Sequence, residues 1–271
     1  MDSSPTTLGK EGSYSQSLER GLSILSSFTS SKALLGVSEL SRAVGLSRSS
    51  THRYIATLTA LGYLLQDAPT RKYRLGPRVL DLGFSAINSM ELRELAAPHL
   101  QELSDETGHT VNMAILDGID ILYIERCRSA RAGQREIDLS LHIGSRLPAY
   151  CTSMGKVLLA DLDPAEQAAR LDRMELSRRG PNTLADRVSL VAELERVREK
   201  GIAVNNEELA YGLRSIAVPI HGQDGTVAAA INLAVHRSMI SMEDLVIRLG
   251  VPLRRTAASI SARIGYRAID G

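Results

Sequence analysis

The segment from Val37 to Leu75 constrains the fold of this chain most, because it combines two short helices, a glycine turn and a basic hairpin. Apolar residues at helical spacing predict a first helix over Val37–Val44, and Gly45-Leu46 supplies a tight turn. Ser47 is a suitable N-cap for a second helix, because its hydroxyl can accept a backbone N–H at the helix start. Two helices joined by a glycine turn predict a helix-turn-helix.

The second helix of this motif has two contrasting faces. Tyr54, Ile55, Leu58 and Leu61 recur at helical spacing and predict an apolar face, and Gly62 is expected to end the helix. The opposite face carries small polar groups and cations and no acids, at Ser49, His52, Arg53 and Ala56, with Arg48 near the start. Arginine can donate two hydrogen bonds to a guanine edge, and hydroxyls near a helix start commonly contact phosphates. This pattern favours DNA contact over the alternative of a solvated face that carries two arginines by chance.

The residues on either side of the motif extend it to a winged form. Leu22, Ile24, Leu25 and Phe28 predict a preceding helix that covers the pair. Strands are expected around a Pro-containing turn, over Tyr63–Leu65 and Lys72–Leu75 with the turn at Asp67–Thr70. Arg71, Lys72 and Arg74 would project from this hairpin toward backbone phosphates. The full set of expected DNA contacts is Ser38, Ser47, Arg48, Ser49, Ser50, His52, Arg53, Arg71 and Lys72.

Charge is distributed unevenly along the chain. Residues 1–80 contain ten Lys/Arg and five Asp/Glu, a net charge of +5, whereas residues 81–271 contain 22 and 26, a net charge of −4. The two values add to the overall +1. A basic amino-terminal part joined to an acidic larger part is typical of a nucleic-acid-binding domain attached to a second domain. Aromatic residues make up only 4% and tryptophan is absent, which favours duplex DNA over single strands.

Length and composition also indicate the compartment. The 271 residues allow two domains. Residues 1–16 are polar and are predicted to be a disordered tail, and the longest apolar run, Val227–Val235, is too short to span a bilayer. The two cysteines, Cys127 and Cys151, have no paired spacing. We therefore expect a cytoplasmic protein with no membrane partner.

We expect an α+β chain of two domains joined by a helix. The predicted winged helix-turn-helix occupies residues 17–77, a linker helix residues 78–97 and the larger domain residues 98–267. Within the linker region, helices are expected over Arg78–Asn88 and Leu92–Thr107, with Pro98 kinking the second or starting a new one. A helix at this place is a natural dimer contact, or else packs on its own domain.

The larger domain combines hairpins with helices, which predicts a single sheet of the kind that binds small ligands. Asp117-Gly118 is expected to be a two-residue hairpin turn. The expected strands are Thr110–Leu116, Ile119–Glu125, Ile137–Ile143, Ile202–Asn205, Ser215–Ile220 and Val227–Val235. The expected helices are Ser153–Asp161, one that starts at Asp163-Pro164, Thr183–Lys200, and Ser241–Arg263 with interruptions at Gly250 and Pro252.

Several blocks in this order resemble the IclR family of transcriptional regulators over nearly the whole chain. They are Leu18–Phe28, the winged helix-turn-helix through Gly76, Arg146–Ala160, Gly201–Ile220 and Val227–Leu233. Gly144–Gly155 further resembles the subgroup that regulates protocatechuate and β-ketoadipate catabolism. The resemblance implies a GAF-like effector domain, dimers that can pair into tetramers, and a small aromatic or dicarboxylic acid as effector. A dimer would bind a two-fold related DNA site, and RNA polymerase is a further candidate partner.

The resemblance also implies where the effector binds. The matching positions are Leu139, Cys151, Ser153, Met154, Gly155, Asn205, Ser215, Asn232 and Ala234. Backbone N–H groups at the start of the Ser153 helix could hold a carboxylate. This chain departs from some relatives in having an amide at Asn205 and a methyl at Ala234. Arg214 and His236 are either counter-charges or surface groups, and we favour surface groups. Glu207 and Glu208 either cap the turn near Gly212 or contact the ligand.

Two other classes of function remain as alternatives. A thiol at a helix start can be activated, which would make Cys151 a nucleophile, but no hydrolase elbow, zinc-protease motif or phosphate loop accompanies it. The histidines lack metal-ligand spacing. We therefore expect no catalytic residues, no metal and no cofactor. The remaining alternative is a DNA-binding protein whose larger domain only assembles and binds no ligand.

Overall fold

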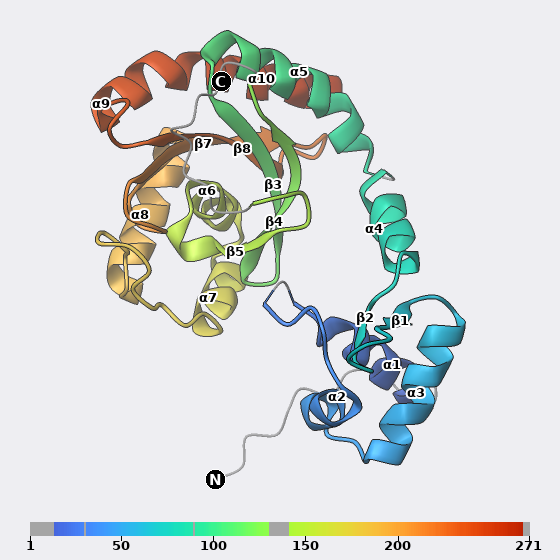
Figure 1. Ribbon diagram of the computed structural model, residues 1–271. Helices are drawn as coiled ribbons and strands as arrows, with labels where there is room; N and C mark the ends of the chain where they lie inside the picture. Colours follow the sequence, from blue (N-terminus) through green and yellow to red (C-terminus); the bar gives the residue numbers. More distant parts are fainter. Residues whose placement is uncertain (1–13, 30, 89, 130–140, 268–271) are drawn as a thin grey trace. The chain divides into compact units, whose positions relative to one another are not determined.

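The computed structural model describes residues 14–29, 31–88, 90–129 and 141–267, and the chain divides into two compact units, residues 1–89 and 90–271 (Figure 1). The expected disordered tail lies almost wholly outside the described residues. The expected boundary near residue 97 falls inside a helix of the second unit.

The first unit is a helix-turn-helix followed by a hairpin. Its elements are α1 (Gln16–Ser26), α2 (Val37–Val44), α3 (Arg48–Ala60), β1 (Leu64–Gln66), β2 (Tyr73–Leu75) and α4 (Arg78–Asn88). Local chemistry explains the turn: Gly45 adopts φ 65°, and the Ser47 hydroxyl accepts the Ser50 N–H at 3.2 Å. Gly62 also has a positive φ, 79°, just after α3 ends. The winged helix-turn-helix is therefore confirmed.

A small apolar core holds the first unit together. It consists of Ile24, Phe28, Leu35, Leu40, Ile55, Leu64 and Tyr73. The prediction for Leu61 was wrong, because this residue follows the end of α3 and its side chain is 55% exposed. Thr51 is buried on the inner face of α3 instead, and its hydroxyl donates to the Ser47 carbonyl at 2.9 Å. Burial of this polar side chain is tolerated because its hydroxyl is hydrogen-bonded.

Helix α5 (Glu91–Thr107) belongs to the second unit and continues through Pro98. The expectation that a new helix starts at Pro98 was wrong. A proline inside a helix removes one hydrogen bond and costs about 3 kcal/mol. Pro98 lies on the exposed side, whereas Ala96, Leu100 and Leu103 on the other side are buried in the main core. Apolar burial at these positions offsets the cost of the proline.

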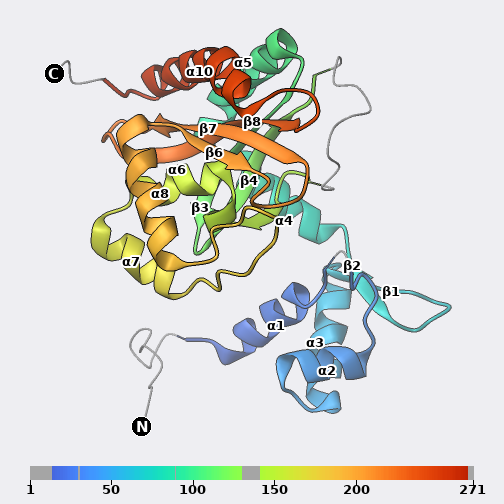
Figure 2. The same ribbon diagram turned by 90° about the vertical axis from the view of Figure 1, so that its left-hand side faces the viewer.

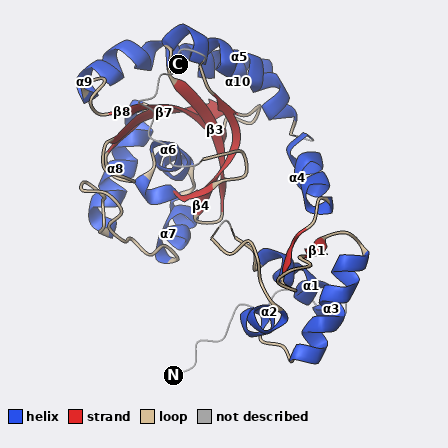
Figure 3. Ribbon diagram, in the orientation of Figure 1, coloured by secondary structure: helices blue, strands red, loops and turns tan. Residues whose placement is uncertain are grey.

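The second unit is built on one sheet, drawn in red in Figure 3. Its strands are antiparallel and have the order β5-β4-β3-β8-β7-β6. The strands are β3 (Thr110–Asp117), β4 (Asp120–Cys127), β5 (Arg146–Pro148), β6 (Ala203–Asn206), β7 (Leu213–His221) and β8 (Val227–His236). The β3–β4 turn lies at Gly118-Ile119, one residue later than predicted, because Asp117 pairs with Asp120 and Gly118 has φ 66°.

Helices cover both faces of the sheet (Figures 1 and 2). Helices α5 and α10 (Gly250–Arg263) lie on one face, and α6 (Ser153–Asp161) and α8 (Arg187–Lys200) on the other. The 3-10 turn η1 (Ala149–Cys151) precedes α6, and α7 (Pro164–Asp172) follows it. The sheet curls around α6, so this helix is buried along its whole described length except at Asp161.

Three further expectations differ from the structure. Helix α8 begins at Arg187, because Thr183 is held in the preceding loop by a hydrogen bond to the Glu208 carbonyl at 2.6 Å. The carboxy-terminal helix is not broken at Gly250 and Pro252: α9 (Met242–Asp244) passes through a π-helical turn, η2 (Leu245–Leu249), into α10. Residues 137–140 of the expected strand Ile137–Ile143 lie outside the described residues, and 141–143 form no strand.

No helix among the described residues has the length and apolar character needed to cross a membrane. Within those same residues, no group of three or more His, Cys, Asp or Glu side chains is arranged to hold a metal ion.

Candidate functional site

The outer face of α3 carries the cations predicted to contact DNA. Arg48, Ser49, His52 and Arg53 are exposed, and Ser50 is half-buried. The Ser47 hydroxyl caps the helix and also lies 3.1 Å from that of Ser49 and 3.0 Å from that of Ser50. Acidic side chains are absent from α3. The start of the helix therefore combines hydroxyls, backbone N–H groups and positive charge, which suits a phosphate backbone.

The hairpin contributes differently from the prediction. Arg71 is exposed and adopts a left-handed conformation with φ 58°, held by hydrogen bonds from its N–H to the Asp67 carbonyl and from Gln66 to its own carbonyl. Lys72 instead turns back to Glu39 of α2, with 3.1 Å between ammonium and carboxylate. Ser38, on the first turn of α2, is half-buried. Arg71 thus remains a phosphate candidate, while Lys72 is shared with an intramolecular ion pair.

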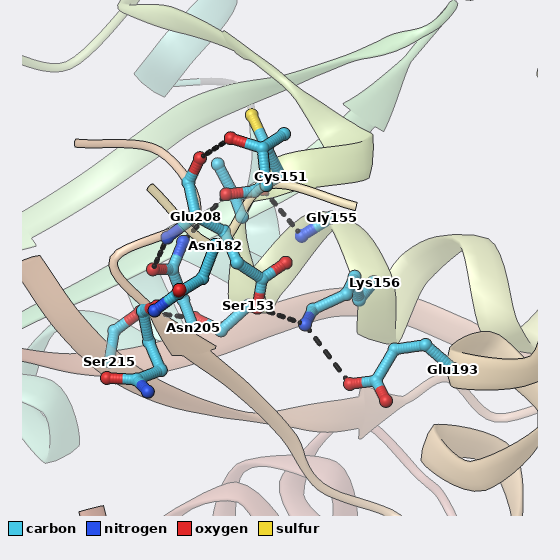
Figure 4. A network of polar contacts seen from close by, with 12 residues as sticks. Cys151, Ser153, Gly155, Lys156, Asn182, Glu193, Asn205, Glu208 and Ser215 are labelled. Carbon is cyan, nitrogen blue, oxygen red and sulfur yellow. Dashed lines mark hydrogen bonds and ion pairs between the residues drawn. The ribbon is translucent and has the colours of Figure 1, made fainter. Parts of the chain in front are cut away.

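In the second unit, most of the predicted effector residues meet on the sheet face that α6 covers. Ser215 pairs with Asn205 on β6 and with Ala234 on β8, so the three side chains share one face. The Ser153 hydroxyl at the start of α6 lies 2.7 Å from that of Ser215 (Figure 4). Asn232, two residues before Ala234, points to the same face. Leu139 lies outside the described residues.

Asn205 connects the elements of this face. Its side-chain amide donates to the Cys151 carbonyl at 2.6 Å, and its amide oxygen accepts the Glu208 N–H at 3.2 Å. One side chain therefore joins β6, the η1 turn and the β6–β7 loop (Figure 4). Cys151, Ser153, Met154 and Gly155 are all buried.

Cys151 has the properties of a packed residue. Burial raises the pKa of its thiol to about 12, with Glu208 adding to this effect and Arg179 opposing it. A raised pKa lowers the fraction of thiolate, which is the nucleophilic form of cysteine. This shift is opposite to the activation at a helix start on which the enzyme alternative depends. Burial likewise raises the pKa of the Cys127 thiol, to about 11.

A buried lysine lies directly behind this site. The Lys156 ammonium, 1% exposed, is 2.7 Å from the Glu208 carboxylate and 3.1 Å from that of Glu193 on α8 (Figure 4). Desolvation raises the pKa of Glu208 in spite of the neighbouring Lys156 charge, and its second carboxylate oxygen has no hydrogen-bond partner among the described residues. These three charges join α6, α8 and the β6–β7 loop.

The charged residues near the β7–β8 end have structural partners. Arg214 donates to the Asn206 side chain at 3.0 Å and to the Ile240 carbonyl at 2.9 Å, and the His236 ring contacts the Ser238 hydroxyl at 2.8 Å. Arg214 also alternates with Ser215, so it points to the opposite face. Glu207 accepts the Gly212 N–H at 2.9 Å, as expected for a turn cap. These contacts favour structural roles for Arg214 and His236.

Sequence reasoning missed four polar residues on the α6 side of the sheet. They are Thr110, Asn112, Arg126 and Lys156. The lysine had a usable signal: α6 is apolar on all sides, so it must be buried, and a buried lysine requires acidic partners. The other three lie on strands whose partners are distant in sequence, and no local pattern marks them.

Two family models match the chain. The "IclR helix-turn-helix domain" matches residues 17–68, and "Bacterial transcriptional regulator IclR C-terminal" matches residues 84–262. Among curated relatives, the Pca regulon regulatory protein of Pseudomonas putida is 40% identical over 232 residues, which cover 86% of this chain and 78% of the relative.

Solved structures of other proteins are similar to this chain over most of its length. A putative transcriptional regulator from Rhodococcus sp. RHA1 is 39% identical, with a TM-score of 0.80 over 93% of this chain and 98% of that one. An IclR homologue from Microbacterium hydrocarbonoxydans, in complex with 4-hydroxybenzoate, is 25% identical with a TM-score of 0.77, covering 92% of this chain and 99% of that one.

Proposed function

The chain belongs to the IclR family of ligand-responsive, DNA-binding transcriptional regulators, and on this premise we propose that it controls the catabolism of an aromatic acid. The observation that carries the proposal is the polar site formed by Ser153, Ser215 and Asn205 beneath α6. The relative from Pseudomonas putida named for the Pca regulon and the relative bound to 4-hydroxybenzoate support this class of ligand.

The effector site is proposed at the start of α6. The residues we assign to it are Leu139, Cys151, Ser153, Met154, Gly155, Asn205, Ser215, Asn232 and Ala234. Thr152 caps α6, and the backbone N–H groups of the first helical turn, with the Ser153 and Ser215 hydroxyls, are suited to a carboxylate. Small and apolar neighbours complete a site of the kind that binds small organic acids.

DNA binding is proposed for α3 and the hairpin. Arg48, Ser49, His52 and Arg53 would contact the major groove, and Arg71 the phosphate backbone. We assign residues 17–77 to this role and residues 98–267 to the effector, with α4 and the start of α5 as the connection. The chain would act as a homodimer on a two-fold related site, for which the exposed apolar side chains of α1, Leu18 and Leu22 at 63% and 54%, offer a contact.

Replacing Arg53 by alanine tests the DNA-binding assignment. The variant should lose about 1–3 kcal/mol of sequence-specific binding, because an arginine on a base edge contributes hydrogen bonds that no other side chain replaces. Fluorescence anisotropy with the specific site and with scrambled DNA measures the difference. Arg20→Ala, a cation on α1 in the same unit, is the control. A loss that is equal on both DNAs would make Arg53 a phosphate contact.

Thermal melting with a panel of acids tests the effector assignment. A ligand at 100 times its Kd stabilises the native state by about 2.7 kcal/mol, which raises the melting temperature of the effector unit by about 5–10 °C. The panel contains 4-hydroxybenzoate, protocatechuate and β-ketoadipate, with methyl 4-hydroxybenzoate as the uncharged control. If no acid shifts the transition, the larger domain only assembles and the effector proposal fails.

A further inference from the structure

Glu39 and Lys72 form an ion pair that joins α2 to the hairpin of the first unit. The Lys72 ammonium lies 3.1 Å from the Oε2 atom of Glu39, and the two side chains are 43% and 44% exposed. Among the described residues of the first unit, this is the one ion pair between an acid and a lysine or arginine. The pair therefore engages a lysine that the sequence predicts to contact DNA.

The backbone holds the Glu39 carboxylate in place. The Gly36 N–H donates to the same Oε2 atom at 2.8 Å, which is the capping-box contact at the start of α2. A Cβ on Gly36 would lie 3.3 Å from this oxygen and 3.9 Å from the Lys72 Cγ, so both side chains pass close to the glycine. The Gly36 N–H and then the Lys72 ammonium lower the pKa of Glu39, so the carboxylate is charged at neutral pH.

Backbone hydrogen bonds also fix Lys72 beside this carboxylate. Leu35, which precedes Gly36, pairs with Tyr73: the Leu35 N–H donates to the Tyr73 carbonyl at 3.0 Å, and the Tyr73 N–H donates back at 2.8 Å. On its other side, the Lys72 carbonyl accepts the Asp67 N–H at 2.8 Å. The two charges therefore meet on a frame that the fold already orders, which reduces the entropy cost of the contact.

The two neighbouring cations of the hairpin differ in their partners. Arg71 is exposed and has no acidic partner among the described residues, whereas the charge of Lys72 is balanced by Glu39. A cation that contacts a DNA phosphate releases counterions, and each such contact adds to the salt dependence of binding. A phosphate that approaches Lys72 has to compete with the fixed carboxylate, which also repels it.

We propose that Glu39 withholds Lys72 from DNA and so lowers the sequence-independent part of the affinity. This inference rests on the proposed contact between the hairpin and DNA. In the native complex Arg71 contacts a phosphate, and Lys72 stays with Glu39. A lysine–phosphate contact strengthens binding to every sequence alike. Glu39 therefore limits how strongly the protein is retained on non-specific DNA.

Glu39→Gln tests this inference, because its amide oxygen can still accept the Gly36 N–H while the competing charge is gone. Fluorescence anisotropy of the full chain over a salt series compares a specific duplex with a scrambled one. At about 0.1 M salt the variant should bind both duplexes about two- to fivefold more tightly, on the scale of one exposed ion pair. The slope of log Kd against log salt should steepen by about 0.9, the contribution of one further phosphate contact.

The double variant Glu39→Gln with Lys72→Met shows whether the gain comes from the released lysine. It carries no charge at either position, like the balanced native pair, so it should return to the native affinity and the native salt slope. If Glu39→Gln keeps its gain without Lys72, or if the native protein has a steeper slope than the double variant, the inference is overturned. The second outcome would mean that Lys72 already contacts a phosphate.

Two further variants separate this inference from the proposed function. Glu19→Gln removes an exposed acid from the first turn of α1, as Glu39→Gln does from the first turn of α2, and should leave the slope unchanged. An equal gain in Glu19→Gln would reduce the effect to overall charge and overturn the inference. Arg71→Met should flatten the slope by about 0.9. If it does so while Glu39→Gln behaves as native, only the inference is overturned; if both keep the native slope, the hairpin assignment fails as well.

Discussion

Replacing Lys156 by alanine is expected to lower the free energy of unfolding by about 3–5 kcal/mol, because it leaves the Glu208 carboxylate buried without its cation. Glu208 is 8% exposed at its side chain, and its nearest charge is the Lys156 ammonium at 2.7 Å. Denaturant titration at neutral pH measures the loss. The loss should exceed that from breaking exposed ion pairs of the same unit, such as Arg146–Asp117 and Arg187–Asp172, because solvent screens those charges.

The pH dependence of this variant follows from the raised pKa of Glu208. A carboxyl whose pKa is raised in the folded state favours folding below its unfolded value, and this contribution is lost as pH rises through the folded pKa. Without Lys156 the pKa of Glu208 rises further. The loss of unfolding free energy in Lys156→Ala should therefore become smaller as the pH is lowered. The double variant Lys156→Met with Glu208→Gln should recover most of the stability at neutral pH. A deficit of under 1 kcal/mol in Lys156→Ala would contradict the buried ion pair.

Replacing Gly155 by alanine is expected to damage both the fold and the effector site. An added Cβ would lie 2.1 Å from the Ala149 carbonyl oxygen and 2.4 Å from the Ala149 Cα, and both of these are backbone atoms that no rotamer change can move. Either α6 or the η1 turn must shift, at a cost of about 1–3 kcal/mol or more. Because Ser153 and Cys151 move with these elements, the affinity for effector should fall as well.

Gly250→Ala is the matched control for this variant. Gly250 is also buried and helical, with φ −66°, but an added Cβ meets nothing closer than the Ile202 side chain at 3.7 Å, an ordinary contact. It should be neutral or slightly stabilising, since alanine favours a helix over glycine by about 1 kcal/mol. Denaturant titration and calorimetry with 4-hydroxybenzoate compare the two variants. Equal stability and equal affinity in Gly155→Ala and Gly250→Ala would show that α6 does not pack tightly on η1.

The helix-turn-helix could be predicted from sequence because its signals are local. The helix Val37–Val44 has the predicted bounds, Gly45 takes the left-handed conformation and Ser47 caps α3. Each of these depends on a few neighbouring residues. Leu61 was predicted to be on the buried face of α3 but is exposed. The apolar spacing in the sequence continues to Leu61, whereas the helix ends one residue earlier, at Ala60.

Polar groups inside the effector unit could not be predicted in this way. Lys156 meets Glu193 and Glu208 across 37 and 52 residues of chain, and Asn112 meets Asn232 across 120. These pairings depend on which strands are neighbours in the sheet, and β3 pairs with β8 although four strands and three α-helices lie between them in the chain. The resemblance to a family supplied Ser153, Asn205, Ser215 and Asn232, but it did not supply Asn112 or Lys156.

An acid bound beside Ser153 and Asn205 would contact α6, η1 and the β6–β7 loop, which the Asn205 and Lys156 contacts hold together. We propose that the signal reaches the DNA through α5 and α4, by changing the spacing of the two α3 helices in a dimer. A coupling of this kind requires that effector and DNA alter each other's affinity by the same factor.

The most direct test is a titration of the full chain with DNA from upstream of its own gene, with and without a saturating acid that raises its melting temperature. Fluorescence anisotropy should show specific binding whose Kd changes by about fivefold or more when the acid is present. The affinity of the protein for the acid, measured with and without that DNA, should change by the same factor. Specific binding that is unchanged by every such acid would contradict the claim that ligand binding in the second unit controls DNA binding by the first.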